Sequence, residues 1–564
     1  MDATGSRQAG ILLPAFSPRR TGDLGIGDTK ALREWIDWAA EHKVSFLQLL
    51  PINEQGVEES PYCAISSTAL DPIYLTLDPE ETPWLTEFHI ARARQRAAHA
   101  LQAAAVDYPL VRKTKRELLE LAWSNFSNND LGHAEEFAAF RETEKSWLDD
   151  YCLFRFLMVL HGESLSWDKW PAHCQTPEGA RALIAKQRNL DAESIDYTLG
   201  FFAFVQWLCF RQWRAVREHA DKMGVKLMGD IPIGVNWHSS DVFFNRADFE
   251  LDWCGGTPPE GSGDSHPFLH QWGQNWGIPL YQWDRMRESG FAWWRQRVAR
   301  ITEIFRMFRI DHILGFYRIY AFPWQQARNH EFIGLSHDQA AERTGGRLPR
   351  WFYRPDDTAE NKAENRDDGD VRLRGVLAGS GDAEIIAEDL GWVPEYVRPH
   401  LADLGIASYR IPHWDCTEHG HPVPGNVFPE NTFACYSTHD HDPICAIWRN
   451  CLRAIEQRES HDAHNALRVI AEFAGIPVTG EWPPFTEGIR LRLVKALFAA
   501  NSRYACLMVT ELFGLDNRIN EPGTSADNWT FRLPWTVEQI RTDGRLKEIS
   551  RLFANLIQIT RRAP

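Results

Sequence analysis

Four short acidic motifs, each closing an apolar run, constrain the fold of this chain more than any other feature. The motifs are MGDIP at 228–232, FRIDH at 308–312, IAEDLG at 386–391 and STHD at 437–440. Each places one carboxylate just past a predicted β-strand, namely Asp230, Asp311, Glu388 and Asp440. Long stretches that include good helices separate the motifs. Because a β/α barrel brings the C-terminal ends of its strands to one rim, the four carboxylates are predicted to gather there.

Eight apolar runs account for the strands of such a barrel. They are 10–16, 44–51, 225–233, 306–312, 384–389, 406–411, 432–438 and 504–511. The runs are near-continuous in Val, Ile, Leu, Met and Phe, as parallel strands buried on both faces should be. One helical face between the first two runs is apolar; it holds Leu32, Trp35, Ile36, Ala39 and Ala40. Asp28 is placed to cap that helix. The predicted fold is α/β, a (β/α)8 TIM barrel.

The connections between the strands differ greatly in length. Helices are predicted at 195–223, 291–305 and 489–502, leading into strands three, four and eight. After the fifth strand, Pro394 suits the start of a helix, whereas Pro399 is predicted to kink or break it.

Two segments are too long for one crossover and are predicted to be insertions in a single catalytic barrel that spans 1–564. Residues 80–190 are rich in Ala, Glu, Arg and Leu with helical periodicity, which predicts a mainly helical subdomain between strands two and three. Residues 335–380 are polar, which predicts an exposed, mobile excursion between strands four and five.

Composition and charge exclude several classes of partner. The chain has 61 Lys and Arg against 77 Asp and Glu, a net charge of -16, which repels nucleic acid and anionic lipid. No secretory signal and no membrane-spanning apolar run is present in the sequence. The 10 Cys are scattered without a CxxC pair, so a reducing, cytoplasmic location is predicted. The sequence does not define an oligomeric state. The 24 Trp and 31 Phe would suit sugar faces as well as core packing.

The motif residues suit the cleavage of an acetal between sugars. Its oxocarbenium-like transition state needs a proton donor and a nearby negative charge, so two carboxyl groups are the minimum. Arg309 lies two positions before Asp311 on a strand and would hold that carboxylate ionised, as a nucleophile requires. Glu388 is flanked by Asp389, whose like charge, if close, would raise its pKa, as a general acid/base requires. Asp440 would add a third charge.

Other interpretations of the same motifs remain open at this stage. A carboxylate at a strand end is more often a solvated loop residue or a helix cap, and Arg309 with Asp311 can be a structural ion pair. His439 and His441, between Asp440 and Asp442, offer metal-ligand types, as does HWDCTEHGH at 413–421. Neither stretch has the spacing of a recognised metal motif. No metal and no cofactor are therefore predicted.

The ordered motifs resemble those of a known family. GDIP, RIDH, EDLG and THD are similar to the four barrel-strand regions of the amylomaltases, or 4-α-glucanotransferases, of the α-amylase clan. Three further elements extend the resemblance: SPY at 60–62, GGTPP at 255–259 followed by GQNWGIPLYQW at 273–283, and RINEPGTSADNWTFR at 518–532. Together they cover most of the barrel, but not the helical insertion or the 335–380 excursion.

The resemblance implies a retaining enzyme that transfers a segment of an α-1,4-glucan to the 4-hydroxyl of an acceptor glucan or glucose. Its substrates would be malto-oligosaccharides and α-1,4-glucans. Asp311 would be the nucleophile, Glu388 the general acid/base and Asp440 the transition-state stabiliser, with Asp311 and Glu388 about 5 Å apart. The residues implied in substrate binding are Tyr62, Asp230, Trp276, Arg309, His312, His439 and Asn520. Among them, Tyr62 would stack on the sugar at the cleavage point, and Trp276 would lie near the acceptor.

The chain departs from the family pattern at several positions. His441 replaces the Asn of THDN, Ile278 replaces the Asn of GNP, and Cys63 and Ala64 follow the SPY element. Val57 stands where a Tyr linked to a secondary glucan site is often found. These departures leave acceptor preference, product length and the ratio of transfer to hydrolysis open.

Three other functions compete with glucan transfer. An α-glucan hydrolase would use the same carboxylates. A metal-dependent phosphohydrolase would be built around His439 and His441. A glucan-binding protein without catalysis would need the aromatic residues but no nucleophile and acid pair.

Overall fold

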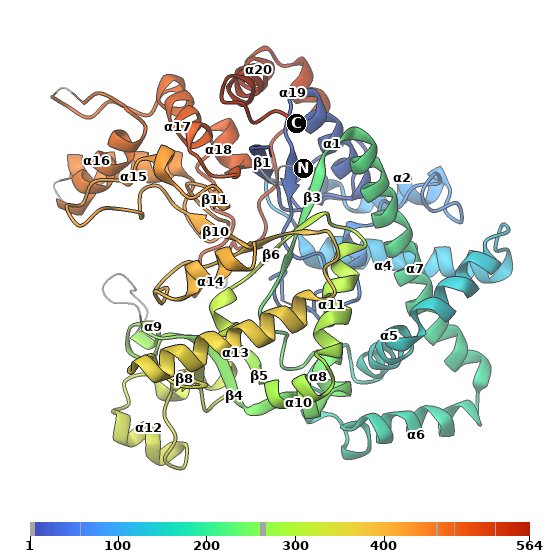
Figure 1. The fold of residues 1–564 in the computed structure, drawn as a ribbon. Helices are drawn as coiled ribbons and strands as arrows, with labels where there is room; N and C mark the ends of the chain where they lie inside the picture. The colour runs from blue at the N-terminus through green and yellow to red at the C-terminus, as the bar shows by residue number, and fades with distance from the viewer. Residues whose placement is uncertain (1–5, 57, 260–266, 458–460, 479, 525) are drawn as a thin grey trace.

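Eight parallel strands close into a barrel in the computed structural model, which describes residues 6–56, 58–259, 267–457, 461–478, 480–524 and 526–564 (Figure 1). The barrel strands are β1 (Gln8–Leu12), β2 (Phe46–Gln48), β3 (Lys226–Ile231), β6 (Met307–Ile310), β9 (Glu384–Ala387), β10 (Ala407–Arg410), β11 (Thr432–Ala434) and β12 (Tyr504–Met508). Their order is β1-β12-β11-β10-β9-β6-β3-β2. Each overlaps one of the eight predicted runs, so the predicted (β/α)8 barrel is confirmed.

The register of β3, β6 and β9 sets the level at which two carboxylates leave the barrel. Ile231 pairs with Ile310, and Ile310 pairs with Ala387. The amide of Asp311 donates to the Ile231 carbonyl at 2.9 Å, which continues the pairing by one residue. The amide of Glu388 donates likewise to the Ile310 carbonyl at 2.9 Å. Asp311 and Glu388 therefore emerge at the same level of the C-terminal rim.

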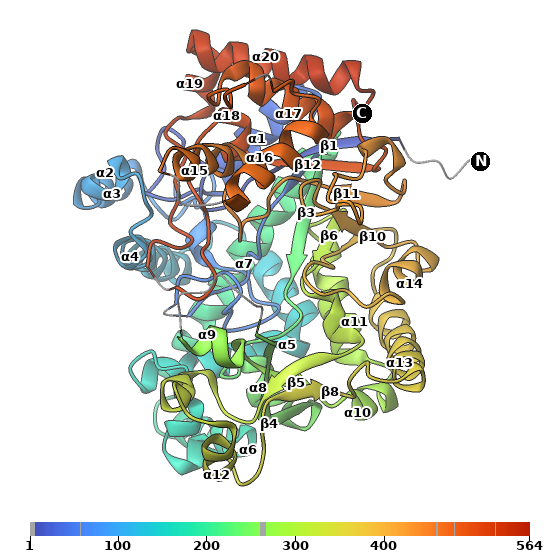
Figure 2. The same ribbon diagram turned by 90° about the vertical axis from the view of Figure 1, so that its left-hand side faces the viewer.

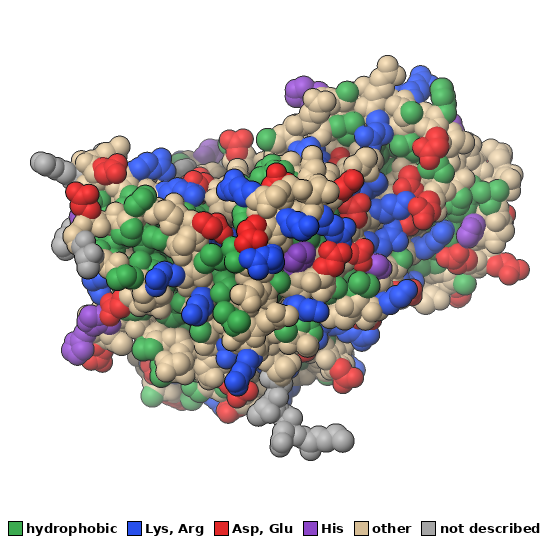
Figure 3. Space-filling view, turned by 90° about the horizontal axis from the view of Figure 1, so that it is seen from above, with side chains coloured by type: hydrophobic (Ala, Val, Ile, Leu, Met, Phe, Trp, Pro, Cys, Tyr) green, Lys and Arg blue, Asp and Glu red, His purple; other side chains and the backbone are tan. Residues whose placement is uncertain are grey.

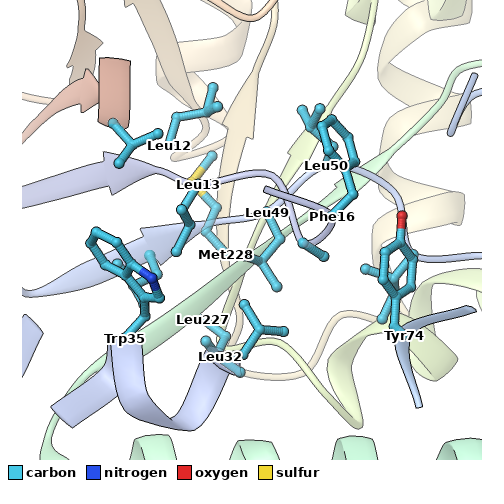
Figure 4. Close-up of a cluster of buried hydrophobic side chains, with 14 of the residues drawn as sticks. Leu12, Leu13, Phe16, Leu32, Trp35, Leu49, Leu50, Tyr74, Leu227 and Met228 are labelled. Carbon is cyan, nitrogen blue, oxygen red and sulfur yellow. The ribbon is translucent and has the colours of Figure 1, made fainter. Parts of the chain in front are cut away.

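Helix α1 (Thr29–Glu41) connects β1 to β2, as predicted. The Asp28 carboxylate caps it by accepting from the Ala31 amide at 2.9 Å. The predicted apolar face packs inward, and only its last member, Ala40, remains partly exposed. Figure 4 shows part of this core, which contains Leu12, Leu13, Leu32, Trp35, Leu49, Leu227 and Met228.

Other predicted helices also lie where the periodicity placed them. They are α7 (Ala192–Met223), α11 (Ala292–Thr302) and α17 (Glu487–Ala499), which precede β3, β6 and β12. The prediction for Pro399 was wrong, because Pro399 is the third residue of α14 (Val397–Asp403). Residues in the first turn of a helix have no intrahelical acceptor for their N–H, so the missing N–H of proline costs no hydrogen bond there and the helix is not broken.

The C-terminal third of the chain adds further helices around β10, β11 and β12. They are α15 (Ile444–Glu456), α16 (His461–Phe473), α18 (Val509–Phe513), α19 (Val537–Thr542) and α20 (Gly544–Ile559). Figure 1 shows them in orange and red at the top and upper left of the molecule.

Residues 80–190, predicted as an inserted helical subdomain, contain a group of helices beside the barrel (Figure 1). They are α2 (Glu87–Arg96), α3 (Ala98–Gln102), α4 (Tyr108–Asn128), α5 (Ala134–Leu160) and α6 (Pro177–Arg188). Phe126 of α4 and Phe137 of α5 pack on Phe204 of α7, with ring centroids 5.0 and 6.3 Å away. An aromatic core thus joins this segment to the long helix that leads into β3.

A second, antiparallel sheet was not predicted. It consists of β4 (Phe249–Thr257), β5 (Gln274–Tyr281), β7 (Ile319–Phe322) and β8 (Arg350–Phe352), in the order β5-β4-β7-β8. Three short helices flank it: α8 (Ser240–Phe244), α9 (Pro267–Trp272) and α10 (Trp283–Glu288). Figure 2 shows the sheet below the barrel strands. The pairing of β4 with β5 has two register shifts, and such irregular strands lack the period-2 pattern that sequence reasoning detects.

Residues 335–380 are more structured than the predicted exposed, mobile excursion. They contain α12 (His337–Arg343), β8 and α13 (Ala359–Leu377). Leu373 and Val376 of α13 are fully buried, and the Arg372 guanidinium donates to the Phe316 carbonyl at 2.8 Å. The helix escaped prediction because most of its residues are polar. Salt bridges between residues one turn apart, such as Arg374 with Asp370, stabilise it.

The surface carries both signs of charge. On the face seen in Figure 3, basic and acidic side chains are interspersed. Within the described residues, we find no helix with the length and apolar character needed to cross a bilayer.

The close approach of β4 to β5 predicts that a side chain at Gly256 would destabilise the protein. A Cβ on Gly256 would lie 1.9 Å from the Gln274 carbonyl oxygen, which belongs to the neighbouring backbone. Gly256→Ala is therefore expected to lower the free energy of unfolding by about 1–3 kcal/mol, measured by urea denaturation. Gly544→Ala is the control, because nothing lies within 4 Å of a Cβ there. Equal stability of the two variants would contradict the close approach.

Candidate active site

Arg309 joins two carboxylates at the C-terminal rim. Its Nη1 lies 2.5 Å from Oδ2 of Asp230, and its Nη2 lies 2.5 Å from Oδ1 of Asp311. The side chains of Arg309 and Asp230 are almost fully buried, whereas that of Asp311 is a quarter exposed. The predicted pairing of Arg309 with Asp311 is present, and it leaves part of the Asp311 carboxylate open to the cavity described below.

Glu388 is held in an environment that favours its protonated form. Burial raises the pKa of Glu388 to about 8, and the Asp311 charge adds to this shift against the opposing effect of Arg309. Its Oε2 accepts from the His312 amide at 2.7 Å, and its Oε1 accepts from the Leu390 amide at 3.0 Å. These bonds fix the carboxyl group beside Asp311, since His312 is the next residue in the chain.

The reason given for the raised pKa of Glu388 needs correction. Asp389 was expected to act through its like charge, but its carboxylate pairs with Arg398 at 2.7 Å and accepts from the Tyr409 amide at 2.6 Å. The negative charge of Asp389 is therefore compensated by Arg398 and by the Tyr409 amide. Burial of Glu388, which the sequence does not show, is the main cause.

Asp440 has the opposite electrostatic environment. Burial alone would raise its pKa, but His439 and the hydrogen bonds from His439 and Asn520 lower the pKa of Asp440 well below its ordinary value. Nε2 of His439 lies 3.2 Å from Oδ2, and the Asn520 amide donates to Oδ1 at 2.6 Å. Asp440 is therefore ionised at neutral pH.

The hydroxyl of Tyr62 connects the two halves of the site. It donates to Oδ2 of Asp230 at 2.7 Å, lies 2.9 Å from Nε2 of His439, and accepts from Nη1 of Arg309 at 3.1 Å. The Tyr62 ring also stacks on the His439 ring, with centroids 5.5 Å apart. Burial raises the pKa of Asp230 to about 6, with the Asp311 charge adding and Arg309 opposing. Tyr62 thus lies in a buried polar network.

A cavity of about 1450 Å³ opens above these groups. The predicted site residues that line it are Tyr62, Trp276, Arg309, Asp311, His312, Glu388, Asp440 and Asn520. Asp230 and His439 are not among the lining residues. Asp230 bonds to Tyr62 and Arg309, and His439 lies beside Tyr62 and Asp440, which do line the cavity. The volume exceeds the roughly 300–1,000 Å³ of ordinary small-molecule pockets, as an extended chain substrate would require.

His312 and Trp276 form one wall of the cavity. His312 has a left-handed backbone with φ of 40°, and burial lowers the pKa of its imidazole to about 4. The Trp276 ring meets the neutral His312 ring edge-on at 4.7 Å.

Sequence reasoning missed several aromatic residues of the cavity. They are Trp237, Trp351, Trp392, Trp414 and Trp529. Three of them lie in or beside quoted motifs: Trp392 directly follows EDLG, Trp414 belongs to HWDCTEHGH, and Trp529 belongs to the segment 518–532. No feature of the sequence placed their rings in the cavity.

Three of the positions at which this chain departs from the family pattern lie in the same cavity. Cys63, Ile278 and His441 line it, and Val57 lies outside the described residues. Nδ1 of His441 lies 2.7 Å from Oγ1 of Thr438, and burial lowers the pKa of this histidine to about 4. Within the described part of the chain, no group of three or more His, Cys, Asp or Glu could hold a metal ion. His439 and His441 thus have separate partners.

The fold and these groups define a class of protein. At the rim of a parallel barrel, a buried glutamate with a raised pKa lies beside an arginine-paired aspartate, and both line an open cavity. This is a (β/α)8-barrel enzyme with the carboxyl groups that chemistry at a glycosidic bond requires.

Comparison with known proteins gives the family. Residues 13–538 match the family model described as 4-alpha-glucanotransferase. The chain belongs to the 4-alpha-glucanotransferase family, and it is an enzyme of that activity.

Two relatives agree with this assignment, and one solved structure has a similar fold. The chain is 28% identical to the 4-alpha-glucanotransferase of Chlamydia muridarum, over 96% of this chain and 94% of that protein. It is also 28% identical to that of Thermus thermophilus, over 93% of this chain and 95% of that protein. Its fold is similar to that of an amylomaltase from Streptococcus agalactiae in complex with acarbose, with a TM-score of 0.76, 21% identity, and coverage of 99% of this chain and 100% of the other.

The buried ion pairs of Arg309 predict that loss of its charge would destabilise the protein. Arg309→Met removes the partner of two carboxylates, so the free energy of unfolding at pH 7 is expected to fall by about 3–5 kcal/mol in urea denaturation. Arg449→Met is the control, because the Arg449–Asp516 pair is 35% and 52% exposed and should contribute no more than about 1 kcal/mol. A loss at Arg309 no larger than at Arg449 would show that Arg309 does not hold the site together.

Proposed function

We propose that Asp311 is the nucleophile and Glu388 the general acid/base of α-1,4-glucan transfer. The observation that carries this proposal is the contrast between the two groups. Asp311 is paired with Arg309 and open to the cavity, whereas burial raises the pKa of Glu388 to about 8. At neutral pH one carboxyl group can attack as an anion while the other donates a proton.

The first step breaks the donor glucan. An Asp311 oxygen attacks the anomeric carbon, the bond from that carbon to the glycosidic oxygen breaks, and the Glu388 proton passes to the departing oxygen. The non-reducing part remains as an ester on Asp311, and the reducing-end part leaves. Asp440, ionised by its contacts with His439 and Asn520, stabilises the positive charge that develops on the sugar ring.

The second step transfers the glycosyl group. The 4-hydroxyl of an acceptor glucan gives its proton to Glu388 and attacks the anomeric carbon, and the Asp311 ester bond breaks. Two inversions restore the original configuration. This mechanism requires the two carboxyl groups to be about 5 Å apart, which is the separation that the family resemblance implies.

The remaining predicted residues have binding roles in this proposal. Arg309, His312 and Tyr62 contact the sugar at the cleavage point, and Trp276 packs beside the acceptor. Asp230 and His439 were predicted to contact the sugar too, but their burial behind the cavity favours positioning roles through Arg309, Tyr62 and Asp440.

Transfer requires that the acceptor side binds sugar and keeps water from the ester. Residues 257–259, 274, 276–278 and 520–524 line the cavity and would perform this task. Residues 163–166, 168 and 169 line it as well, so we propose that the 80–190 insertion is a subdomain that contributes one wall. An α-glucan hydrolase would use the same carboxylates but leave this side open to water.

Malto-oligosaccharides and α-1,4-glucans are the proposed substrates, and the cytoplasm is the proposed location. The ten cysteines are all free in the structure, in keeping with a reducing compartment.

Incubation with maltotriose tests the proposed function. Transfer gives a ladder of longer oligosaccharides, whereas glucose and maltose alone would indicate hydrolysis. Asp311→Asn is expected to be nearly inactive, and Glu388→Gln to lose about 10²–10⁴-fold in rate, because each removes one proposed chemical group. Chromatography of the products measures both variants. Full turnover by Asp311→Asn, or a sugar trapped on another residue, would refute the assignment.

The pH dependence of the first step follows from the pKa of Glu388. Because that pKa is raised to about 8, the acid form dominates below pH 8 and is lost above it. The value of kcat/KM for maltotriose is therefore expected to fall about tenfold per pH unit above pH 8. Asp389→Asn should leave the midpoint of this fall in place, since Asp389 is paired with Arg398. A fall centred near pH 5 would contradict the role of Glu388.

A further inference from the structure

One aromatic side chain at the rim of the cavity is unusually exposed. Trp392 lines the cavity, yet 72% of its surface is accessible to solvent. Trp414, another exposed Trp of the cavity, reaches only 47%. An indole ring presents a large apolar face, and flat faces of this kind suit the apolar faces of sugar rings. Trp392 is therefore a surface that a glucan could cover.

A buried cation packs against this ring. The guanidinium carbon of Arg318 lies 5.1 Å from the ring centroid of Trp392 and 3.7 Å from that of Trp351. The Arg318 side chain is only 3% exposed, so its charge is shielded from water and its attraction to both rings is strengthened. Arg318 and Trp351 line the same cavity as Trp392.

Arg318 is itself held in place by a buried carboxylate. Its Nε lies 2.7 Å from Oδ2 of Asp356, whose side chain is 5% exposed. Oδ1 of Asp356 accepts from the Tyr396 hydroxyl at 3.1 Å and from the Asn365 side-chain amide at 2.9 Å. Asn365 belongs to α13, and Tyr396 lies just before α14. The support thus joins several segments and is formed before any substrate binds, which lowers the entropy lost on binding.

The position of the ring relative to Glu388 indicates which part of the substrate it would meet. The Leu390 amide donates to Glu388, and Trp392 follows two residues later. In the proposed mechanism Glu388 protonates the departing oxygen, which belongs to the reducing-end part of the donor. In the same proposal, Tyr62 and Asp440 contact the sugar that becomes bonded to Asp311. Trp392 therefore lies on the leaving-group side, where the acceptor later binds.

We propose that Trp392, supported by Arg318 and Trp351, binds the second sugar of the acceptor glucan, counted from the newly formed bond. This inference rests on the proposed function. It assigns a preference to the enzyme: acceptors of two or more glucose units should bind better than glucose, which can fill only the first position. The three side chains together are named the Trp392 platform.

The test uses α-maltosyl fluoride as donor, because fluoride leaves without occupying a sugar position on the acceptor side. Glucose and maltose are compared as acceptors, and the initial rate of each transfer product gives a KM for each. Trp392→Ala is expected to raise the KM for maltose about fivefold and the KM for glucose by less than about twofold. Trp392→Phe keeps an aromatic face and should restore most of the affinity for maltose.

Phe88→Ala is the matched control. Phe88 is an exposed aromatic residue on α2, 70% accessible and not among the residues that line the cavity. Both KM values should be unchanged in that variant. A maltose KM that Trp392→Ala leaves unaltered, or an equal rise for glucose and maltose, would overturn the platform, since an equal rise places the effect at the first sugar or at Glu388.

Failure of the proposed function would be distinct from failure of the platform. If the unaltered protein released fluoride but formed no transfer product with either acceptor, transfer itself would be refuted. If transfer occurred with equal KM values for glucose and maltose in all variants, only the platform would be refuted.

Discussion

The two ion pairs of Arg309 are the interaction on which the rest of the site depends. Arg309 comes from β6, and Asp230 comes from the adjacent strand β3, so the charges lie across a strand pair inside the barrel. Buried charges persist only when they are partnered, and a guanidinium can face two carboxylates at once. Asp311 is the second carboxylate that Arg309 pairs with. Tyr62 joins the same group through its hydroxyl, which ties the long connection after β2 to the rim.

Burial and hydrogen bonding give the carboxyl groups of the site different protonation states at one pH. Burial is the largest effect on both Glu388 and Asp440. It prevails at Glu388, whose two backbone amide donors do not offset it, and it is outweighed at Asp440 by His439 and Asn520. Environment, and not residue type, thus separates the proposed acid from the proposed anionic stabiliser.

In the proposed function, the cavity is what lets an enzyme with glycosidase-type carboxylates transfer glucan instead of hydrolysing it. Residues 163–166 and 520–524 and parts of the second sheet line it, and the barrel strands alone would not supply these walls. As proposed, Trp276 and the Trp392 platform would place aromatic surface on the side where the acceptor must compete with water. Affinity for a second acceptor sugar would lengthen the time for which water is excluded from the ester.

The sequence by itself determined the barrel and the carboxylates at its rim. Strands buried on both faces must be near-continuously apolar, and the residues that end them, such as Asp311 and Glu388, are then fixed at one edge. Only the tertiary structure decided the antiparallel sheet, the buried state of Glu388, the separate pairing of Asp389 and the contact of Arg318 with Trp392. Each of these depends on which distant segments pack together, and local periodicity carries no information about that packing.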